Sequence, residues 1–232
     1  MVTTSAPFRR INPLRLILID HLPSFHDSLR QAIKPGSSLN IVAESDCAED
    51  ILAGNINLNA DVALVDVDLP DSSRFKVCQW LVAHKPHLAV LCLAYWDWDS
   101  YLVGAYAAGA RGVVLRSFAS KDLIPLIEKA AIMSIFSRDQ LNRIQKWNES
   151  FGRTFRSLKP REWQAFWLAV DGLSNQAIAS RLDLSENTVE KLMTEILKQF
   201  NLNSRAQLIS LVIKQHFETL RDEENNRLLT FH

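Results

Sequence analysis

The sequence predicts an α/β domain followed by an all-α domain, within a chain of 232 residues. Before residue 132, short apolar runs typical of buried strands alternate with amphipathic helical segments, which favours a parallel sheet covered by helices on both faces. After residue 157, apolar residues recur only at helical spacing. The formal net charge is zero and 47% of the residues are hydrophobic, as in ordinary globular proteins. Any contact with nucleic acid must therefore come from a local basic patch.

The predicted sheet has five strands, with four helices between and after them. The strands are expected at residues 14–19, 39–43, 62–65, 89–93 and 112–115. The helices are expected around residues 25–33, 77–81, 102–108 and 123–130. Asp20 follows the first strand, and Asp66 follows the third. Because sites in such sheets lie at the carboxyl ends of the strands, these two carboxylates mark a candidate site.

Composition predicts how the rest of the chain is divided. We expect a flexible arm (1–13), a first domain (14–131), a linker (132–157), a second domain (158–217) and a C-terminal tail (218–232). Within the linker, residues 138–147 have helical composition. Residues 148–156 are mostly polar and include a glycine, which predicts a flexible joint.

The three cysteines are expected to be buried, reduced thiols. Cys47, Cys78 and Cys92 are odd in number, and no two of them form a Cys-x-x-Cys pair. A redox or metal-binding role is the alternative. No apolar run reaches the length of a membrane span, so we expect a cytoplasmic protein without a membrane partner.

The segment from Gly172 to Glu190 predicts a short helix, a tight turn and the start of a second helix. Ser185 is a good N-cap for that second helix. The second helix then carries an apolar stripe at helical spacing, formed by Val189, Met193, Ile196 and Phe200. Two helices joined in this way form a helix-turn-helix.

Several short motifs, at separated positions, carry a family resemblance. Pro160-Arg-Glu162, Gly172-Leu-Ser-Asn175, Ile178-Ala179 and Ser185-Glu-Asn-Thr-Val189 resemble the LuxR/FixJ-type DNA-binding domain. Leu16–Asp20, Val65–Pro70 and Gly109–Arg116 resemble the receiver domain of response regulators. The resemblance implies a NarL-like two-component response regulator of bacteria. It implies a flavodoxin-like five-stranded parallel receiver domain, then a four-helix LuxR-type domain. We expect no enzymatic activity, because the sequence has no nucleophile–base constellation and no phosphate-cradling glycine loop.

The resemblance places Asp66 at the position of the phosphoacceptor and Asp20 in the acidic pocket, yet three positions depart from the pattern. His21 stands where the family has a second acidic residue, Ala94 where it has Thr or Ser, and Arg116 where it has Lys. We therefore expect an atypical receiver that is phosphorylated poorly or not at all. We also expect Arg116 to be able to pair with Asp66 or Asp20.

The same three departures weaken the case for a bound metal ion at this site. Phosphoryl transfer to a carboxylate needs a hard cation held by oxygen ligands. The candidate metal ligands are Asp20 and Asp66, and imidazole at position 21 suits transition metals better than magnesium. We expect no cofactor, or weakly bound Mg²⁺.

The second helix of the helix-turn-helix is expected to meet promoter DNA. The residues expected to contact it are Thr188, Glu190, Lys191, Thr194, Lys198 and Arg205. Glu190 is acidic where the family often has Lys. Between Arg156 and His216, basic residues exceed acidic ones by only two. Affinity per monomer is then low, so we expect a homodimer.

The segment from Tyr95 to Tyr101 carries four aromatic residues. Trp96, Trp98 and Tyr101 are candidates for a partner surface, with packing against the domain as the alternative. The expected partners are double-stranded promoter DNA, a second copy of the chain and a sensor kinase or other protein.

The resulting hypothesis is a transcription regulator, cytoplasmic and nucleoid-associated, that acts independently of ordinary Asp phosphorylation. The competing hypothesis is a protein-interaction or small-molecule-sensing module with weakened DNA binding.

Overall fold

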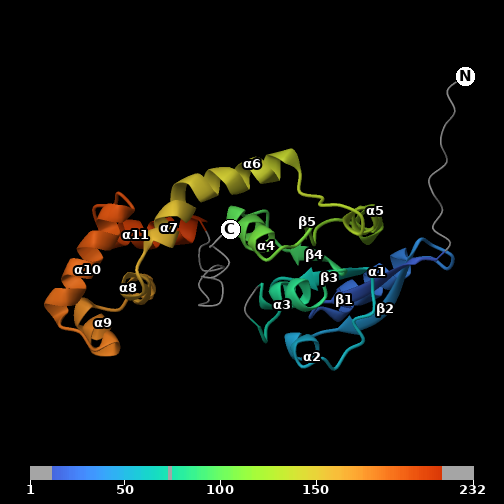
Figure 1. The fold of residues 1–232 in the computed structure, drawn as a ribbon, viewed down its shortest axis with the longest axis horizontal. Helices are drawn as coiled ribbons and strands as arrows, with labels where there is room; N and C mark the ends of the chain where they lie inside the picture. The colour runs from blue at the N-terminus through green and yellow to red at the C-terminus, as the bar shows by residue number, and fades with distance from the viewer. Residues whose placement is uncertain (1–11, 73–74, 216–232) are drawn as a thin grey trace, which may run out of the picture. The chain divides into compact units, whose positions relative to one another are not determined.

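The computed structural model describes residues 12–72 and 75–215, and Figure 1 shows its ribbon. These residues form two compact units. The first contains residues up to 97 and residues 105–136, and the second contains residues 98–104 and those from 137 onward. Most of the predicted arm and the predicted tail lie outside the described residues. Each helix in the described part of the chain is too short or too polar to cross a membrane.

The first unit contains a parallel sheet in the order β2-β1-β3-β4-β5. The strands are β1 (Leu14–Ile19), β2 (Leu39–Ser45), β3 (Val62–Asp66), β4 (Ala89–Ala94) and β5 (Gly112–Leu115). All five strand predictions are confirmed within one or two residues. The order places β1 and β3 side by side at the centre, so the residues that follow them meet at one edge.

Helices follow the strands, as expected for a flavodoxin-like sheet. They are α1 (Pro23–Ala32), α2 (Ala48–Leu52), α3 (Lys76–His84), α4 (Asp99–Ala107) and α5 (Ser120–Ala130). Alternate residues of the strands pack with α1 and α5 in one core, which includes Leu16, Leu64, Leu91, Leu29 and Ile127. Side chains alternate across a strand, so the neighbouring residues face the opposite side of the sheet.

The sequence did not predict helix α2, which has only five residues. Its amino terminus is stabilised from a distant part of the chain, because the Asp71 carboxylate accepts hydrogen bonds from the backbone N–H groups of Ala48 and Glu49. An anion at this end also complements the helix dipole. A helix this short has no detectable periodicity, so only the tertiary contact identifies it.

The second unit is helical in its described part. It contains α6 (Arg138–Trp147), a π-helical turn η1 (Asn148–Gly152), α7 (Arg153–Ser157), α8 (Pro160–Val170), α9 (Asn175–Leu182), α10 (Glu186–Gln199) and α11 (Arg205–Gln215). The predicted helix-turn-helix is confirmed as α9 and α10. Ser174 and Ser185 cap these helices, because their hydroxyls accept hydrogen bonds from the N–H groups of Ala177 and Thr188.

The prediction of a flexible joint at residues 148–156 is wrong, because η1 and α7 continue the helix that α6 begins. Two interactions hold the joint. Arg156 donates hydrogen bonds to the backbone carbonyl and the side-chain oxygen of Asn148. The Trp147 ring packs over Gly152, where a Cβ atom would lie 2.5 Å from the ring. Polar composition indicated a loop, but these contacts stabilise the helical turn.

Phe155 joins this joint to the core of the helix-turn-helix unit. Its side chain is 1% exposed. Its ring centroid lies 5.0 Å from that of Phe166, 5.2 Å from that of Trp163 and 5.5 Å from that of Phe200. The domain boundary expected at residue 158 therefore leaves out a core residue.

Candidate functional site

The two carboxylates at the strand ends are joined by one guanidinium. Asp20 and Asp66 are buried, and the Arg116 side chain that follows β5 is only 9% exposed. Arg116 Nη1 lies 2.7 Å from Asp20 Oδ2, and Nη2 lies 2.9 Å from Asp66 Oδ2. The structure thus brings together three of the predicted site residues, with Arg116 as the shared cation.

Aromatic rings hold the Arg116 guanidinium from two elements. Its Cζ atom lies 4.9 Å from the centre of the Phe25 ring of α1 and 4.7 Å from the centre of the Tyr95 ring. Both distances are in the range of cation–π contacts. The Arg116 backbone N–H also donates to the carbonyl of Ala94, 2.8 Å away. Nothing in the sequence marks Phe25 or Tyr95 for this contact, except that Tyr95 is an aromatic residue directly after Ala94.

His21 occupies the remaining side of Asp66. Its Nδ1 atom lies 2.6 Å from Asp66 Oδ2 and donates to it when that nitrogen carries the proton. The other oxygen, Asp66 Oδ1, accepts the backbone N–H of Asp68 at 3.0 Å. Both oxygens of the predicted phosphoacceptor are therefore engaged, and Oδ2 has two cationic or donor neighbours.

Asp20 is fully buried, so a negative charge on its carboxylate requires a compensating partner. Burial raises the pKa of Asp20 above its ordinary value, and this is partly offset by the Leu22 N–H and by the Arg116 guanidinium. Asp20 Oδ1 accepts the Leu22 N–H at 2.7 Å. The Arg116 guanidinium is thus a counter-charge that offsets part of the cost of burying this carboxylate.

The donor set does not fit Mg²⁺ while Arg116 is in place. Asp20, His21 and Asp66 each have a possible ligand atom within 4.8 Å of the others. Mg²⁺ prefers six oxygen ligands in an octahedron, whereas this cluster includes an imidazole nitrogen. A guanidinium already lies within 3 Å of both carboxylates, so a divalent cation would meet like charge. The predicted weak Mg²⁺ site therefore requires Arg116 to move.

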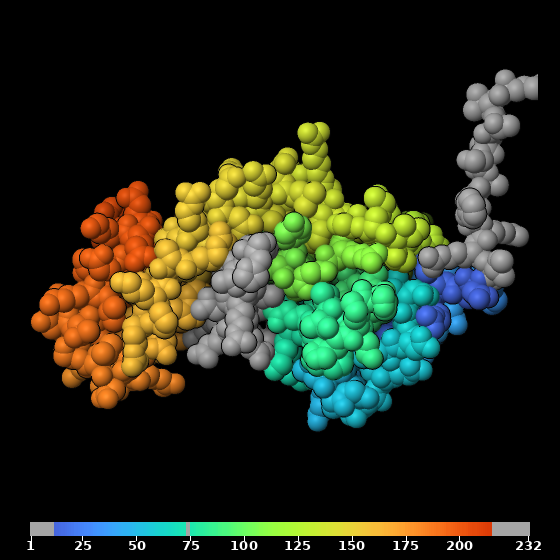
Figure 2. Space-filling model, in the orientation of Figure 1, coloured from blue at the N-terminus to red at the C-terminus, as the bar shows by residue number. Residues whose placement is uncertain are grey.

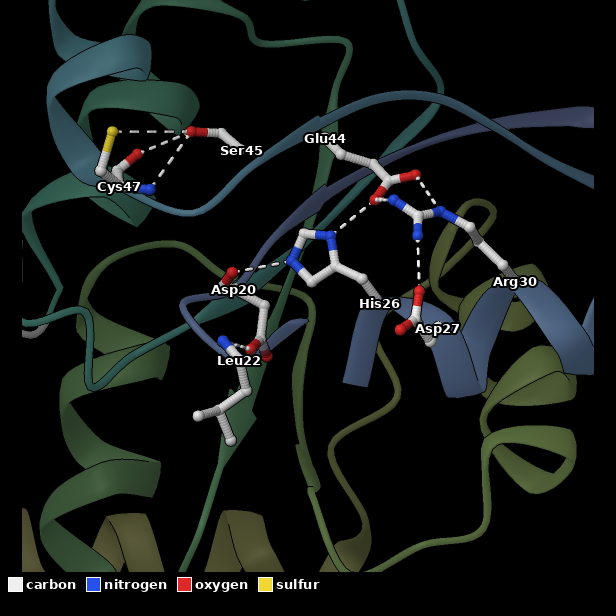
Figure 3. Close-up of polar contacts among 8 residues, drawn as sticks. All are labelled: Asp20, Leu22, His26, Asp27, Arg30, Glu44, Ser45 and Cys47. Atoms are coloured by element: carbon white, nitrogen blue, oxygen red, sulfur yellow. Dashed lines mark hydrogen bonds and ion pairs between the residues drawn. The ribbon is translucent and has the colours of Figure 1, made fainter. Parts of the chain in front are cut away.

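A polar cleft of about 320 Å³ opens beside Asp20. In Figure 3, His26 lies between Asp20 and Glu44, and the Arg30 guanidinium faces Glu44 and Asp27. His26 Nδ1 lies 2.6 Å from Glu44 Oε2, and Nε2 lies 2.7 Å from the Asp20 carbonyl oxygen. Both partners are acceptors, so only a ring with two N–H groups satisfies both contacts.

The Glu44 contacts predict a pH-dependent contribution to stability. Burial alone would raise the pKa of Glu44, but hydrogen bonds from Arg30 and His26 bring it below its ordinary value. A lowered carboxylate pKa stabilises the fold above the unfolded pKa, and this stabilisation is lost as pH falls through the folded pKa. Glu44→Gln should therefore lower the Tm at pH 7, and the difference from the wild type should vanish toward about pH 3. Thermal melts across pH test this. Glu195→Gln, at an exposed position in the middle of α10, is the control and should change the Tm little. A gap for Glu44→Gln that persists at pH 3 would contradict the assignment.

The predicted DNA-contacting residues of α10 are exposed. Thr188, Glu190, Lys191, Thr194 and Lys198 all face solvent. Figure 2 shows orange atoms of this part of the chain at the surface. Thr194 Oγ1 donates to the Glu190 carbonyl at 2.9 Å, and the Thr188 hydroxyl lies 2.7 Å from Ser185 Oγ. The lysines are thus the cations that α10 offers to a phosphate.

Arg205 has a structural partner that the sequence argument missed. It is half-buried, and its Nε and Nη2 atoms donate to the Ala169 carbonyl at 3.1 and 2.6 Å. Ala169 lies in the last turn of α8, where carbonyls lack partners within the helix. Arg205 therefore holds the start of α11 against the end of α8, which is a structural role beside the predicted contact with DNA.

The predicted aromatic partner surface is only partly exposed. Trp96 is 57% exposed, whereas Tyr101 is 2% exposed. Trp98 stacks on Tyr101 with ring centroids 5.3 Å apart. The prediction for Tyr101 is wrong, because its ring packs into the fold and cannot face a partner.

Comparison with known sequences agrees with both halves of the fold. Residues 16–128 match the family "Response regulator receiver domain", and residues 156–212 match "Bacterial regulatory proteins, luxR family". The nitrate/nitrite response regulator NarP of Escherichia coli is 28% identical over 207 residues, which cover 88% of this chain and 96% of NarP. The transcriptional regulatory protein DegU of Brevibacillus brevis is 24% identical over 229 residues, which cover 90% of this chain and 97% of DegU.

Solved structures share the fold. RcsB from Salmonella enterica serovar Typhimurium, bound to promoter P1flhDC in the presence of phosphomimetic beryllofluoride, superposes with a TM-score of 0.59 and 18% identity. The match covers 87% of this chain and 98% of that one. An RcsB–DNA complex gives a TM-score of 0.55, again with 18% identity, and covers 87% of this chain and 98% of that one. With a receiver, a LuxR-type helix-turn-helix and relatives that span nearly the whole chain, the protein belongs to the LuxR/NarL-type family of DNA-binding response regulators.

Proposed function

We propose that this response regulator controls transcription without phosphorylation of Asp66. The observation that carries the proposal is the Arg116 guanidinium, which lies within 3 Å of both Asp20 and Asp66. This guanidinium already supplies, beside both carboxylates, the kind of positive charge that a hard cation supplies to offset a phosphoryl group. His21 and the Asp68 N–H engage Asp66 as well, so nucleophilic attack by this carboxylate would require several contacts to break.

Ala94 weakens any response that phosphorylation could produce. A hydrogen bond to a charged group contributes about 1.5–3 kcal/mol. Moving a two-state equilibrium from 1:99 to 99:1 takes about 5.5 kcal/mol. Alanine has no hydroxyl to offer, so a large part of the required switching energy is absent at this position.

A phosphoryl analogue tests the proposal directly. We expect beryllofluoride with Mg²⁺ to leave the Tm of the wild-type protein unchanged. A triple variant with His21→Asp, Ala94→Thr and Arg116→Lys restores the family's pattern and should show a saturable rise in Tm. Asp66→Asn in the triple variant is the matched control and should abolish the rise. Saturable binding to the wild-type protein that Asp66→Asn removes would overturn the proposal.

We further propose that the output is the binding of promoter DNA by a homodimer through α10. A solved structure of two RcsB dimers bound to two parallel DNAs supports this, because a protein of similar fold is dimeric on DNA there. Lys191 and Lys198 are exposed on α10 and provide charge for phosphates. Glu190 lies between them and the start of the helix, so the affinity of each monomer is kept low.

Salt-dependent DNA binding is the measurement that tests this output. Lys191→Ala should weaken binding to all sequences and reduce the slope of log K against log salt by about 1. Glu190→Lys should strengthen binding. Lys146→Ala on α6 is the control and should change neither quantity. Fluorescence anisotropy with genomic promoter fragments gives the affinity and its dependence on salt. An absence of binding even at low salt would favour an interaction module instead.

A small-molecule sensor is the second candidate, because the cleft beside Asp20 has about 320 Å³ of space and polar walls. A metabolite that raises the Tm without Mg²⁺, and does so less in Glu44→Gln, would support it. DNA binding and ligand sensing are compatible, so the anisotropy experiment is repeated with any such ligand.

A further inference from the structure

Two cysteines that are 14 residues apart in sequence meet in the core of the first unit. Cys78 lies on α3 and Cys92 on β4, and their Sγ atoms are 3.5 Å apart. Both side chains are fully buried, and all three cysteines of the chain are free thiols. The sequence alone gives no sign that these two residues meet, because it does not show which face of a helix packs against which strand.

The geometry follows from the alternation of β4. Leu91 and Leu93 belong to the core shared with α1 and α5, so Cys92 between them points to the opposite face. Cys92 is in register with Val65, the residue before Asp66, and lies two residues before Ala94. One thiol of the pair therefore lies on a strand that leads to the receiver site, and the other lies on α3, which packs against that strand.

The environment makes the thiols slow to react. A hydrogen bond with Cys78 and complete burial raise the pKa of the Cys92 thiol well above its ordinary value. The thiolate is the reactive form, so a small oxidant reaches this pair only when α3 opens locally. Unlike a single exposed thiol, each thiol of this pair already has a second thiol in contact, which can react with it after oxidation.

We propose that Cys78 and Cys92 are a redox modification site, at which a peroxide closes a reversible disulfide between α3 and β4. One thiolate attacks hydrogen peroxide, which gives a sulfenic acid and hydroxide. The neighbouring thiol then attacks that sulfur and water leaves. In total, two thiols and one peroxide become one disulfide and two waters, and the two electrons reduce the O–O bond.

The step needs little movement. A disulfide has an S–S length of about 2.05 Å, so the two sulfur atoms must approach by about 1.5 Å from their present separation. Closing the loop between residues 78 and 92 restricts the unfolded chain and stabilises the fold. The site is independent of Asp66 chemistry, so its failure would leave the proposed function intact.

The experiment uses the full-length protein treated with hydrogen peroxide and then alkylated with N-ethylmaleimide in denaturant. We expect an intact mass lower by about 2 Da before alkylation. We also expect a linked pair of peptides after chymotryptic cleavage at Trp80, and a Tm higher by several degrees. Dithiothreitol should reverse all three changes.

Single substitutions decide the assignment. Cys78→Ala and Cys92→Ala should each abolish the link, and Cys47→Ala, the matched control, should keep it. Circular dichroism shows that each variant is folded. Two outcomes would overturn the proposal: full alkylation of Cys78 and Cys92 at peroxide concentrations that oxidise Cys47, or a link that always includes Cys47.

Discussion

Replacing Arg116 with alanine is expected to destabilise the first unit by about 3–5 kcal/mol at neutral pH. The substitution removes the cation that lies within 3 Å of two buried carboxylates. Asp20 and Asp66 would then repel each other in a poorly solvated site. The His21 ring and the N–H groups of Leu22 and Asp68 would remain as partners, and they do not replace the lost cation. Urea unfolding followed by circular dichroism measures the loss.

Two further variants separate charge from geometry. Arg116→Lys keeps the charge but loses the planar contact with Phe25 and Tyr95, so we expect an intermediate loss. Arg15→Ala removes a partly exposed pair with Asp61 and should cost no more than about 1 kcal/mol. Mg²⁺ should recover part of the stability of Arg116→Ala, because the freed carboxylates then suit a divalent cation. An alanine variant as stable as the wild type without Mg²⁺ would contradict the role assigned to Arg116.

Phe155→Ala is expected to destabilise the second unit by about 3–5 kcal/mol. The Phe155 ring is buried and packs against aromatic rings of α8 and the end of α10. Truncation leaves a cavity that these rigid rings cannot fill. The measurement is urea unfolding of the full chain, followed by tryptophan fluorescence.

Leu141→Ala is the control, because Leu141 is 41% exposed on α6 and its loss should change stability by about 0.5 kcal/mol or less. Truncation gives a second test. A fragment that begins at residue 158 lacks Phe155 and should unfold at lower urea than one that begins at residue 137. Equal midpoints for the two fragments would show that Phe155 is not part of the core.

The regular elements of this chain were predictable from sequence because their patterns are local. The five strands are continuous apolar runs, and α9 and α10 begin at serines that cap them. Helix α2 was not predictable, because Asp71, which lies 23 residues beyond Ala48, stabilises its amino terminus. The helical joint at 148–157 was not predictable either, because the hydrogen bonds between Arg156 and Asn148 form only once the segment is helical. Composition reports neither kind of contact.

The candidate site was predictable in part. The strand ends located Asp20 and Asp66, and the family resemblance identified which of their neighbours are unusual. The sequence left open whether Arg116 pairs with Asp66 or with Asp20, whereas in the structure it pairs with both. The rings of Phe25 and Tyr95 and the burial of Tyr101 depend on how loops pack, which one sequence does not show.

A cation that is part of the chain differs from one drawn from solution in a simple way. Its effective concentration beside Asp20 and Asp66 is fixed by covalent structure, so neither chelators nor the supply of magnesium in the cell changes the occupancy of this position. The entropy lost in holding the charge is lost once, when the chain folds, and not at each binding event. The charge balance around Asp20 and Asp66 is therefore insensitive to the concentration of divalent cations, and it is established when the chain folds.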